Sequence, residues 1–333
     1  MRVARARARL VLRRAGAIGD LMLSDDARLS DRLRLALADR LRCLAEATAR
    51  DLAHYAARLA GEGPGPAMDG VADRLWQAGV LAEPGLVAEL IAQLRQQMLA
   101  EALATDNAHG DAPSLLVRLI EAPDRIVAGA ARGLLAAENR ARTILSEGGH
   151  VTLPAPLYQW LIWTVAAALR QPGQEALDQA LAQAAERLLT AQDEDERPGG
   201  VAMRLAAAID ARPDELPGLL IESLSNRQLG LFIALLAHAL SMDDAEMRDM
   251  VLEPEGDRLW LALRALDQDR QTIARIGLML GDADPRRDVE GFADSLNAIM
   301  AITPDQARRA IAPLLLPSAF RAAIERWEGA VRA

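Results

Sequence analysis

Residues 27–60 read ARLSDRLRLALADRLRCLAEATARDLAHYAARLA, and this stretch decides the fold class. Its apolar side chains recur at steps of three and four residues, the spacing of one face of an α-helix. They are Leu29, Leu33, Leu37, Leu41, Leu44, Leu52, Tyr55 and Leu59. The pattern predicts either one long amphipathic helix or two helices placed end to end.

The composition of the whole chain points the same way. Of the 333 residues 51% are apolar, only 3% are aromatic, and most of the apolar residues are Ala and Leu, with few of the β-branched residues that sheets favour. We therefore predict an all-α fold of many short antiparallel helices. Short helices joined by short turns favour a two-lobed array, either solenoid-like (HEAT-like) or orthogonal, over a four-helix bundle.

Helical periodicity continues in almost every segment between Gly and Pro residues. Residues 154–169 are apolar around nearly the whole helix, so we expect neighbouring helices or a partner protein to cover this segment. The other expected helices cover residues 68–77, 84–104, 114–121, 124–145, 174–191, 201–211, 216–223, 228–240, 244–252, 257–267, 270–280, 288–302, 305–311 and 318–331. Two of them begin with the spacing of a capping box, Asp243 with Glu246 and Thr303 with Gln306.

Charge and Pro/Gly content divide the chain into four predicted parts. Residues 1–24 form a basic arm, and residues 25–192 form an N-terminal helical lobe. Residues 193–200, DEDERPGG, join four acids to Pro and two Gly and are the predicted linker. Residues 201–333 form a C-terminal helical lobe.

The basic arm contrasts with an acidic body. The net charge of the chain is −9, yet its first 14 residues contain six arginines and no acid. Arg2, Arg5, Arg9 and Arg13 share one arc of a helical wheel, whereas Arg7 and Arg14 lie on the other side. Any contact with anionic lipid or nucleic acid is expected through this arm only. The alternative is a solvated arm, or one docked on the acidic body of its own chain.

The sequence has no lysine, one cysteine (Cys43) and four scattered histidines. The absence of lysine excludes Schiff-base chemistry and the lysine of phosphate-loop enzymes. No histidine pair has the spacing of a zinc or di-iron site, and the loop acids Asp282, Asp284 and Asp288 lack the rest of a calcium loop. We expect no cofactor, no metal and no catalytic site, and we interpret His238 as a packed histidine near a helix end.

The expected location is the cytoplasm. The longest apolar runs are shorter than the roughly 20 residues that cross a bilayer, so no transmembrane segment is expected. Gly16, Gly19 and Asp20 interrupt the stretch after the basic N-terminus, so it does not resemble a secretory signal. A lone cysteine fits a reducing compartment.

One block of the C-terminal half resembles a known family. It contains LIESLS at 220–225, LGLFIALLAHAL at 229–240, MRDMVL at 247–252, the turn Glu255-Gly256-Asp257, and LALRAL at 261–266. These residues are similar to an alphaproteobacterial helical family known as domain of unknown function 2336, best over residues 216–280. The resemblance implies an all-helical bacterial protein with no assigned activity and no catalytic residues to transfer.

Four side chains are candidates for a partner or ligand surface. Trp160 and Trp163 lie in the apolar segment at 154–169 and are either core residues or partner contacts. Arg264 is the cation of an apolar helix, so it either forms internal pairs that fix helix register or binds an anion in a cleft. Arg275 is a second candidate for gating such a cleft.

The sequence thus offers much helical surface and little reactive chemistry. The leading hypothesis is a helical protein–protein interaction module, an adaptor or regulatory scaffold without catalytic chemistry, whose partner is another protein. The alternative is a sensor that binds a small anionic ligand between the two helical lobes.

Overall fold

The computed structural model describes residues 29–60, 66, 68–104, 113–146, 153–192 and 197–332. Within these ranges the protein is all-α, with 16 α-helices, two short 3-10 helices and no strand. The α-helices are α2 (Asp31–Ala60), α3 (Val71–Gln77), α4 (Pro84–Ala102), α5 (Leu115–Ile120), α6 (Arg125–Ser146), α7 (Ala155–Ala168), α8 (Glu175–Ala191), α9 (Pro198–Ile209), α10 (Leu216–Ser225), α11 (Leu229–Leu240), α12 (Asp244–Leu252), α13 (Asp257–Ala265), α14 (Arg270–Ala283), α15 (Val289–Ala301), α16 (Pro304–Ile311) and α17 (Ser318–Arg332). The 3-10 helices are η1 (Val80–Ala82) and η4 (Ala312–Leu315).

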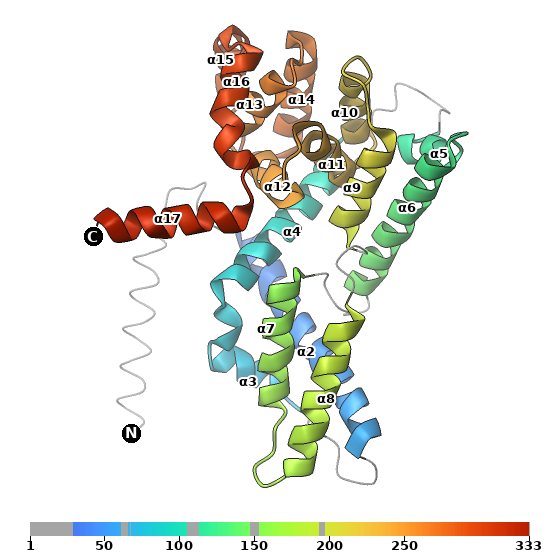
Figure 1. Ribbon diagram of the computed structural model, residues 1–333, viewed down its shortest axis with the longest axis vertical. Helices are drawn as coiled ribbons and strands as arrows, with labels where there is room; N and C mark the ends of the chain where they lie inside the picture. The colour runs from blue at the N-terminus through green and yellow to red at the C-terminus, as the bar shows by residue number, and fades with distance from the viewer. Residues whose placement is uncertain are drawn as a thin grey trace.

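The helices form two lobes stacked along the long axis (Figure 1). The lower lobe contains α2, α3, η1, α7 and α8, and its core also includes Leu86, Leu90 and Leu94 of α4. The upper lobe contains α5, α6 and α9 to α16, and its core includes Leu99 and Leu103 at the other end of α4. One continuous helix, α4, therefore contributes to both cores.

The two cores do not follow the order of the chain. Helices α5 and α6 precede α7 and α8 in sequence, yet they pack into the upper core, where α6 contacts α9. The division into lobes at 25–192 and 201–333 stays a prediction about domains. The two clusters of buried apolar residues do not follow that division, because α5 and α6 belong to the upper one. Within the predicted linker, residues 193–196 lie outside the described residues, and residues 198–200 form the first turn of α9.

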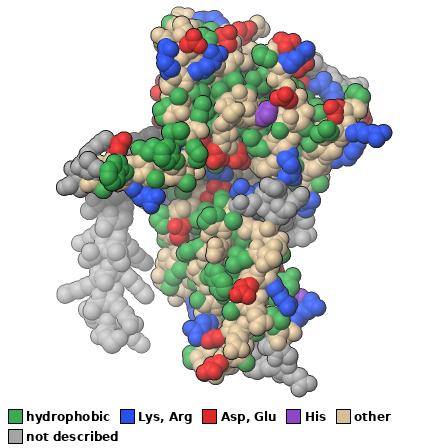
Figure 2. Space-filling model, in the orientation of Figure 1, with side chains coloured by type: hydrophobic (Ala, Val, Ile, Leu, Met, Phe, Trp, Pro, Cys, Tyr) green, Lys and Arg blue, Asp and Glu red, His purple; other side chains and the backbone are tan. Residues whose placement is uncertain are grey.

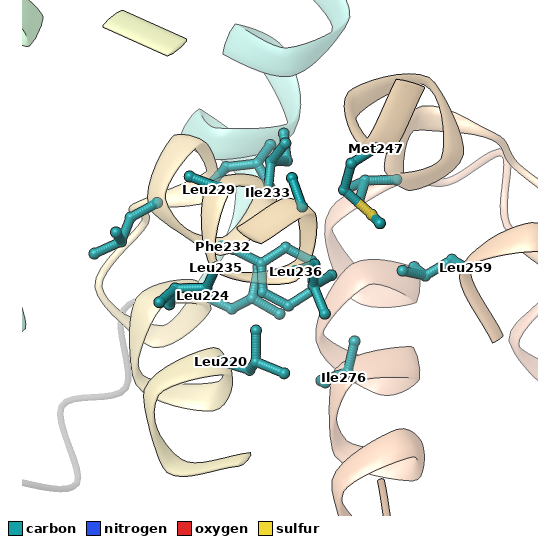
Figure 3. Packing of buried hydrophobic residues seen from close by; sticks show 14 of the residues in the cluster. Leu220, Leu224, Leu229, Phe232, Ile233, Leu235, Leu236, Met247, Leu259 and Ile276 are labelled. Atoms are coloured by element: carbon teal, nitrogen blue, oxygen red, sulfur yellow. The ribbon is translucent and has the colours of Figure 1, made fainter. Parts of the chain in front are cut away.

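The upper core is organised around α11, whose residues are apolar on every face. Its buried residues include Leu229, Leu231, Phe232 and Leu236. Figure 3 shows Phe232 in the middle of this packing, with Leu220 and Leu224 of α10 on one side and Ile276 of α14 on the other. A helix that is apolar all round is stable only when other helices enclose it, and α11 meets that condition.

Helix α7 meets this condition only in part. Tyr158, Leu161, Ile162 and Val165 are buried against the lower core, but Trp163 remains 39% exposed. The 30-residue α2 is one helix, which settles the choice between one helix and two.

The two predicted capping boxes have different outcomes. Thr303 and Gln306 form one at the start of α16, where each side chain bonds the backbone of the other residue. Asp243 caps α12 through a bond from the Ala245 amide, but the prediction of a box with Glu246 is wrong. The carboxylate of Glu246 turns away from the cap because Arg258 and Arg321 bind it.

Candidate functional site

A cleft of about 650 Å³ lies where the two lobes meet. Its walls are one face of α4, the second half of α6, the starts of α9, α11 and α12, and Arg40 of α2. In Figure 1, α4 and the lower ends of α6 and α9 reach the narrowing between the lobes, which is also visible in the space-filling view of Figure 2. Leu134, Leu229 and Ile233 give the cleft an apolar floor.

Helical periodicity explains why α4 presents polar groups to the cleft. Leu86, Leu90 and Leu94 recur every four residues and are buried in the lower core. Glu89, Gln93 and Gln96 recur at steps of four and three residues on another face, and they line the cleft. The helix begins with Pro84 at its first position and Glu83 as its cap, whose carboxylate accepts the Leu86 amide.

A partly buried ion pair ties α4 to the upper lobe. Arg248 of α12 donates two hydrogen bonds to Glu89, at 3.0 and 2.7 Å, and Gln93 donates to the same carboxylate at 2.7 Å. Burial alone would lower the pKa of Arg248, but the hydrogen bond and the charge of Glu89 outweigh burial and raise that pKa. The two charges of this pair offset each other within the protein, and only Arg248 Nε lacks a hydrogen-bond partner among the described residues.

Asp244 occupies the start of α9. A Cβ added to Gly199 would lie 2.6 Å from Asp244 Oδ2, so the carboxylate approaches the first turn of α9 where only glycine leaves room. Burial, followed by the hydrogen bond and charge of Asp243, raises the pKa of Asp244 against the opposing charges of Arg197 and Arg248. An internal carboxylate thus already meets the positive end of this helix.

Two other arginines of the cleft lack such partners among the described residues. Arg40 is half-buried, forms no hydrogen bond or ion pair with that part of the chain, and has its pKa lowered by burial. Arg227 donates from Nε to the Leu103 carbonyl at 2.8 Å. Its two terminal nitrogens make no bond to the residues that the structure describes.

The predicted site residues lie away from the cleft. Arg264 is buried at 7% exposure and donates to the carbonyls of Ile302 (3.0 Å) and Gln268 (2.9 Å). Arg275 is exposed on α14, Trp160 packs against the lower core, and Trp163 is exposed on α7. The predicted polyanion contacts Arg2, Arg5, Arg9 and Arg13 lie outside the described residues.

His238, Asp284 and Asp288 have structural partners. His238 Nε2 lies 3.1 Å from Asp210 Oδ1. Asp284 binds Arg286 at 2.7 Å, Asp288 caps α15, and Asp282 is exposed. In the described ranges no group of three or more His, Cys, Asp or Glu residues is placed to hold a metal ion.

A second surface is formed by α17, which projects sideways from the body (Figure 1). Phe320, Ile324 and Trp327 recur at steps of four and three residues, and Phe320 and Trp327 are 55% and 72% exposed. Figure 2 shows apolar side chains gathered on this projecting helix. Arg321, in the first turn of α17, binds Glu246 of α12 and anchors that turn to the body.

The cleft and the apolar stripe of α17 were not predicted from the sequence, for different reasons. The spacing of Phe320, Ile324 and Trp327 was readable within residues 318–331. The cleft had no such local signal, because Glu89 and Arg248 are 159 residues apart and Arg40 is on yet another helix.

Comparison with known proteins gives no family assignment. No family model, no curated protein and no solved structure matches this chain. Among the residues described, no helix is both long enough and apolar enough to span a membrane.

Proposed function

We propose that this protein is a helical protein–protein interaction module, an adaptor or regulatory scaffold that acts without catalytic chemistry in the cytoplasm. The observation that carries the proposal is α17, an amphipathic helix held away from the body, whose apolar stripe consists of the exposed Phe320 and Trp327 with the half-buried Ile324 between them. Large apolar side chains exposed together in this way mark interaction sites. The occupant is a partner protein with an apolar groove between helices, into which the stripe fits at positions i, i+4 and i+7.

The attachment of α17 supports this role. The ion pair between Arg321 and Glu246 fixes the first turn of the helix, so binding does not require the whole helix to become ordered. Fixing a binding element before it meets its partner lowers the entropic cost of association. Tryptophan is also enriched among the residues that contribute most to binding energy.

The proposal is tested with a photo-crosslinking amino acid placed at Ala323, beside the stripe, in cells of the native host. We expect a defined crosslinked protein that is lost when Trp327→Glu is added and kept when Arg326→Gln is added. A crosslinker at Gln183, exposed on α8, is the positional control. Recovery of uncrosslinked monomer from the Ala323 protein would refute the proposal, and a product of twice the chain mass would identify a second copy as the occupant.

The cleft favours a second candidate function, a sensor that binds a small anionic ligand between the lobes. The specific observation is a cavity lined by both lobes in which Arg40 has no partner among the described residues. A thermal-shift screen against anionic metabolites tests it, because a ligand that binds only the folded protein raises the unfolding temperature. A flat profile over the whole set would reject this candidate.

We also propose membership of the family of domain of unknown function 2336. The resembling residues 216–280 fall on α10 to α14 and contribute Leu220, Phe232 and Leu263 to the upper core. Their pattern is explained by helix packing, so the proposal concerns ancestry and adds no residue role.

A further inference from the structure

The cleft has the size of a small-molecule site. Its volume of about 650 Å³ lies within the range of roughly 300–1,000 Å³ typical of ligand pockets. Leu134, Leu229 and Ile233 line its floor, and polar side chains from both lobes form its walls. An apolar floor with a few convergent polar groups is the usual composition of such a pocket.

The charges around the cleft do not balance when their partners are counted. Glu89 is bound by Arg248, and Glu101 lies 3.7 Å from Arg32 and accepts a bond from Gln97. Glu138, Arg140 and Arg197 also have partners of their own, and Asp244 lies against the start of α9 and interacts with the charges of Arg197 and Arg248. What remains is the guanidinium of Arg40 and the terminal nitrogens of Arg227, neither of which is paired with a carboxylate of the described chain. The cleft therefore has positive charge that its described walls do not neutralise.

The backbone at Arg227 is unusual. Its φ is +60°, and the bonds from its amide to the Leu224 carbonyl (3.0 Å) and from Gln228 to Ser223 (2.8 Å) form the Schellman end of α10. Glycine is favoured at this position, and the other described residues with positive φ besides glycine are Asp210, Ser241 and Asp267, which are small and polar. The side chain of Arg227 accounts for an arginine here, because its Nε bonds the Leu103 carbonyl and the residue lines the cleft.

The start of α11 adds donors beside Arg227. Its cap residue Gln228 makes no side-chain bond to the helix, and Gln228 Oε1 is buried without a partner among the described residues. Gly230 at the second position leaves the backbone open, since a Cβ added there would meet only Gln96 Nε2, at 3.7 Å. The backbone amides of this first turn form the positive end of α11.

We propose that the cleft binds a small molecule carrying a phosphate or diphosphate group, held by Arg227 and the start of α11 in the upper lobe and by Arg40 in the lower lobe. The proposal rests on the second candidate function and specifies its ligand. The carboxylate of Glu89 is held from two neighbouring helices, by Arg248 and Gln93, whereas the cleft offers unpaired cationic donors from both lobes. A phosphate has enough acceptor oxygens to use them, and arginine matches its geometry.

Calorimetric titration of the full chain with sodium pyrophosphate at constant ionic strength tests the proposal. We expect saturable binding at one site, weakened by about tenfold or more in Arg40→Gln and in Arg227→Gly, since each variant removes a charge-assisted contact. Arg227→Gly also relieves the positive-φ strain, which offsets the lost bond to the Leu103 carbonyl, so its loss of binding occurs with little change in unfolding temperature. Arg187→Gln, an exposed arginine of α8, is the matched control and keeps wild-type affinity.

A second pair of variants tests the position of the anion. Gly230→Asp places a carboxylate where the phosphate is expected and abolishes pyrophosphate binding, whereas Gly230→Asn has the same shape without the charge and retains it within a few-fold. Absence of saturable binding, or equal weakening by Arg187→Gln and Arg40→Gln, would overturn the proposal. A third outcome separates the ligand from the function. If a dicarboxylate such as succinate bound in an Arg40-dependent way and pyrophosphate did not bind, the phosphate assignment would be overturned but the sensor function would stand.

Discussion

Arg264 satisfies its buried charge mainly with carbonyl oxygens. Its two hydrogen bonds reach Ile302 at the end of α15 and Gln268 in the turn after α13, while the carboxylate of Asp267 lies 3.7 Å away and is mostly exposed. Arg264→Met leaves these carbonyls without their donor and is expected to lower the free energy of unfolding by about 1–3 kcal/mol. Urea denaturation measures the change. The exposed Arg275→Met serves as control, with a change within about 0.5 kcal/mol, and equal losses in both variants would contradict this role for Arg264.

Asp284 makes stability depend on acidic pH. Burial alone would raise its pKa, but the hydrogen bonds and charge of Arg286, together with the charge of Arg287, outweigh burial and lower the pKa below the ordinary value. The folded state then holds the Asp284 proton more weakly than the unfolded state does, so the ion pair stabilises the protein above the ordinary carboxyl pKa of about 4. This contribution is lost as pH falls through the lowered pKa.

The variant Asp284→Asn isolates this contribution. We expect the difference in unfolding free energy between wild type and variant to be constant from neutral pH to about pH 5 and to shrink below about pH 4. Denaturant titrations at a series of pH values measure it, with Asp282→Asn, an exposed acid two residues away, as control. A difference that stays the same down to pH 3 would contradict the assigned ion pair.

Single residues also show what the sequence could and could not predict. The cap at Thr303 was predictable because its partner Gln306 is three residues away, and both bonds of the box are present. Glu246 has the same spacing from Asp243, but the Glu246 carboxylate binds Arg321, which is 75 residues away in the sequence. The sequence does not indicate that Arg40 lacks an acidic partner. That situation arises only in the folded protein, where acids around the cleft pair with other residues, as Glu89 pairs with Arg248.

Helices α14 and α15 approach closely because α14 has glycine at two positions one turn apart. A Cβ at Gly277 would lie 2.2 Å from Phe292 Cζ, and one at Gly281 would lie 2.5 Å from Val289 Cγ2. Gly277→Ala therefore forces the packed ring of Phe292 to move, and we expect it to destabilise the protein by about 1–3 kcal/mol although alanine is the better helix former. Thermal unfolding measures the effect.

Gly129 of α6 provides the matched control, because a Cβ there meets nothing within 4 Å. Gly129→Ala is expected to stabilise the protein by about 0.5–1 kcal/mol through helix propensity and the lower entropy of the unfolded chain. Stabilisation by both substitutions would show that the contact between Gly277 and Phe292 is not rigid.

Helix periodicity predicts which residues are buried far better than it predicts what covers a helix. Leu33, Leu37, Leu41 and Leu44 of α2 are all buried as their spacing indicates. Residues 154–169 and 229–240 are both strongly apolar, yet α11 is enclosed and α7 leaves Trp163 at the surface. The difference depends on the positions of helices distant in sequence, such as α10 and α14 around Phe232.

The lobes as packed in space are joined by α4 and not only by residues 193–200. An acidic Pro/Gly segment indicates a boundary in the sequence, but α5 and α6 return to the upper lobe before α7 and α8 complete the lower one. Because α4 contributes Leu90 to one core and Leu99 to the other, and Arg248 binds Glu89, local opening of one lobe disturbs the other. The two cores are therefore expected to unfold together.

Gln97→Pro tests this coupling, since residue 97 lies on α4 between the buried Leu94 of the lower core and Leu99 of the upper core, with its own side chain exposed. Proline removes a backbone hydrogen bond and breaks the helix at a cost of about 3 kcal/mol or more, and Gln97→Ala is the control that keeps the helix intact. Hydrogen exchange read by mass spectrometry at increasing denaturant should show peptides of α8 and α11 losing protection together in the wild type and in the control, and at separate concentrations in Gln97→Pro. A single shared transition in the proline variant would mean that the lobes are coupled through the contacts across the cleft and not through the continuity of α4.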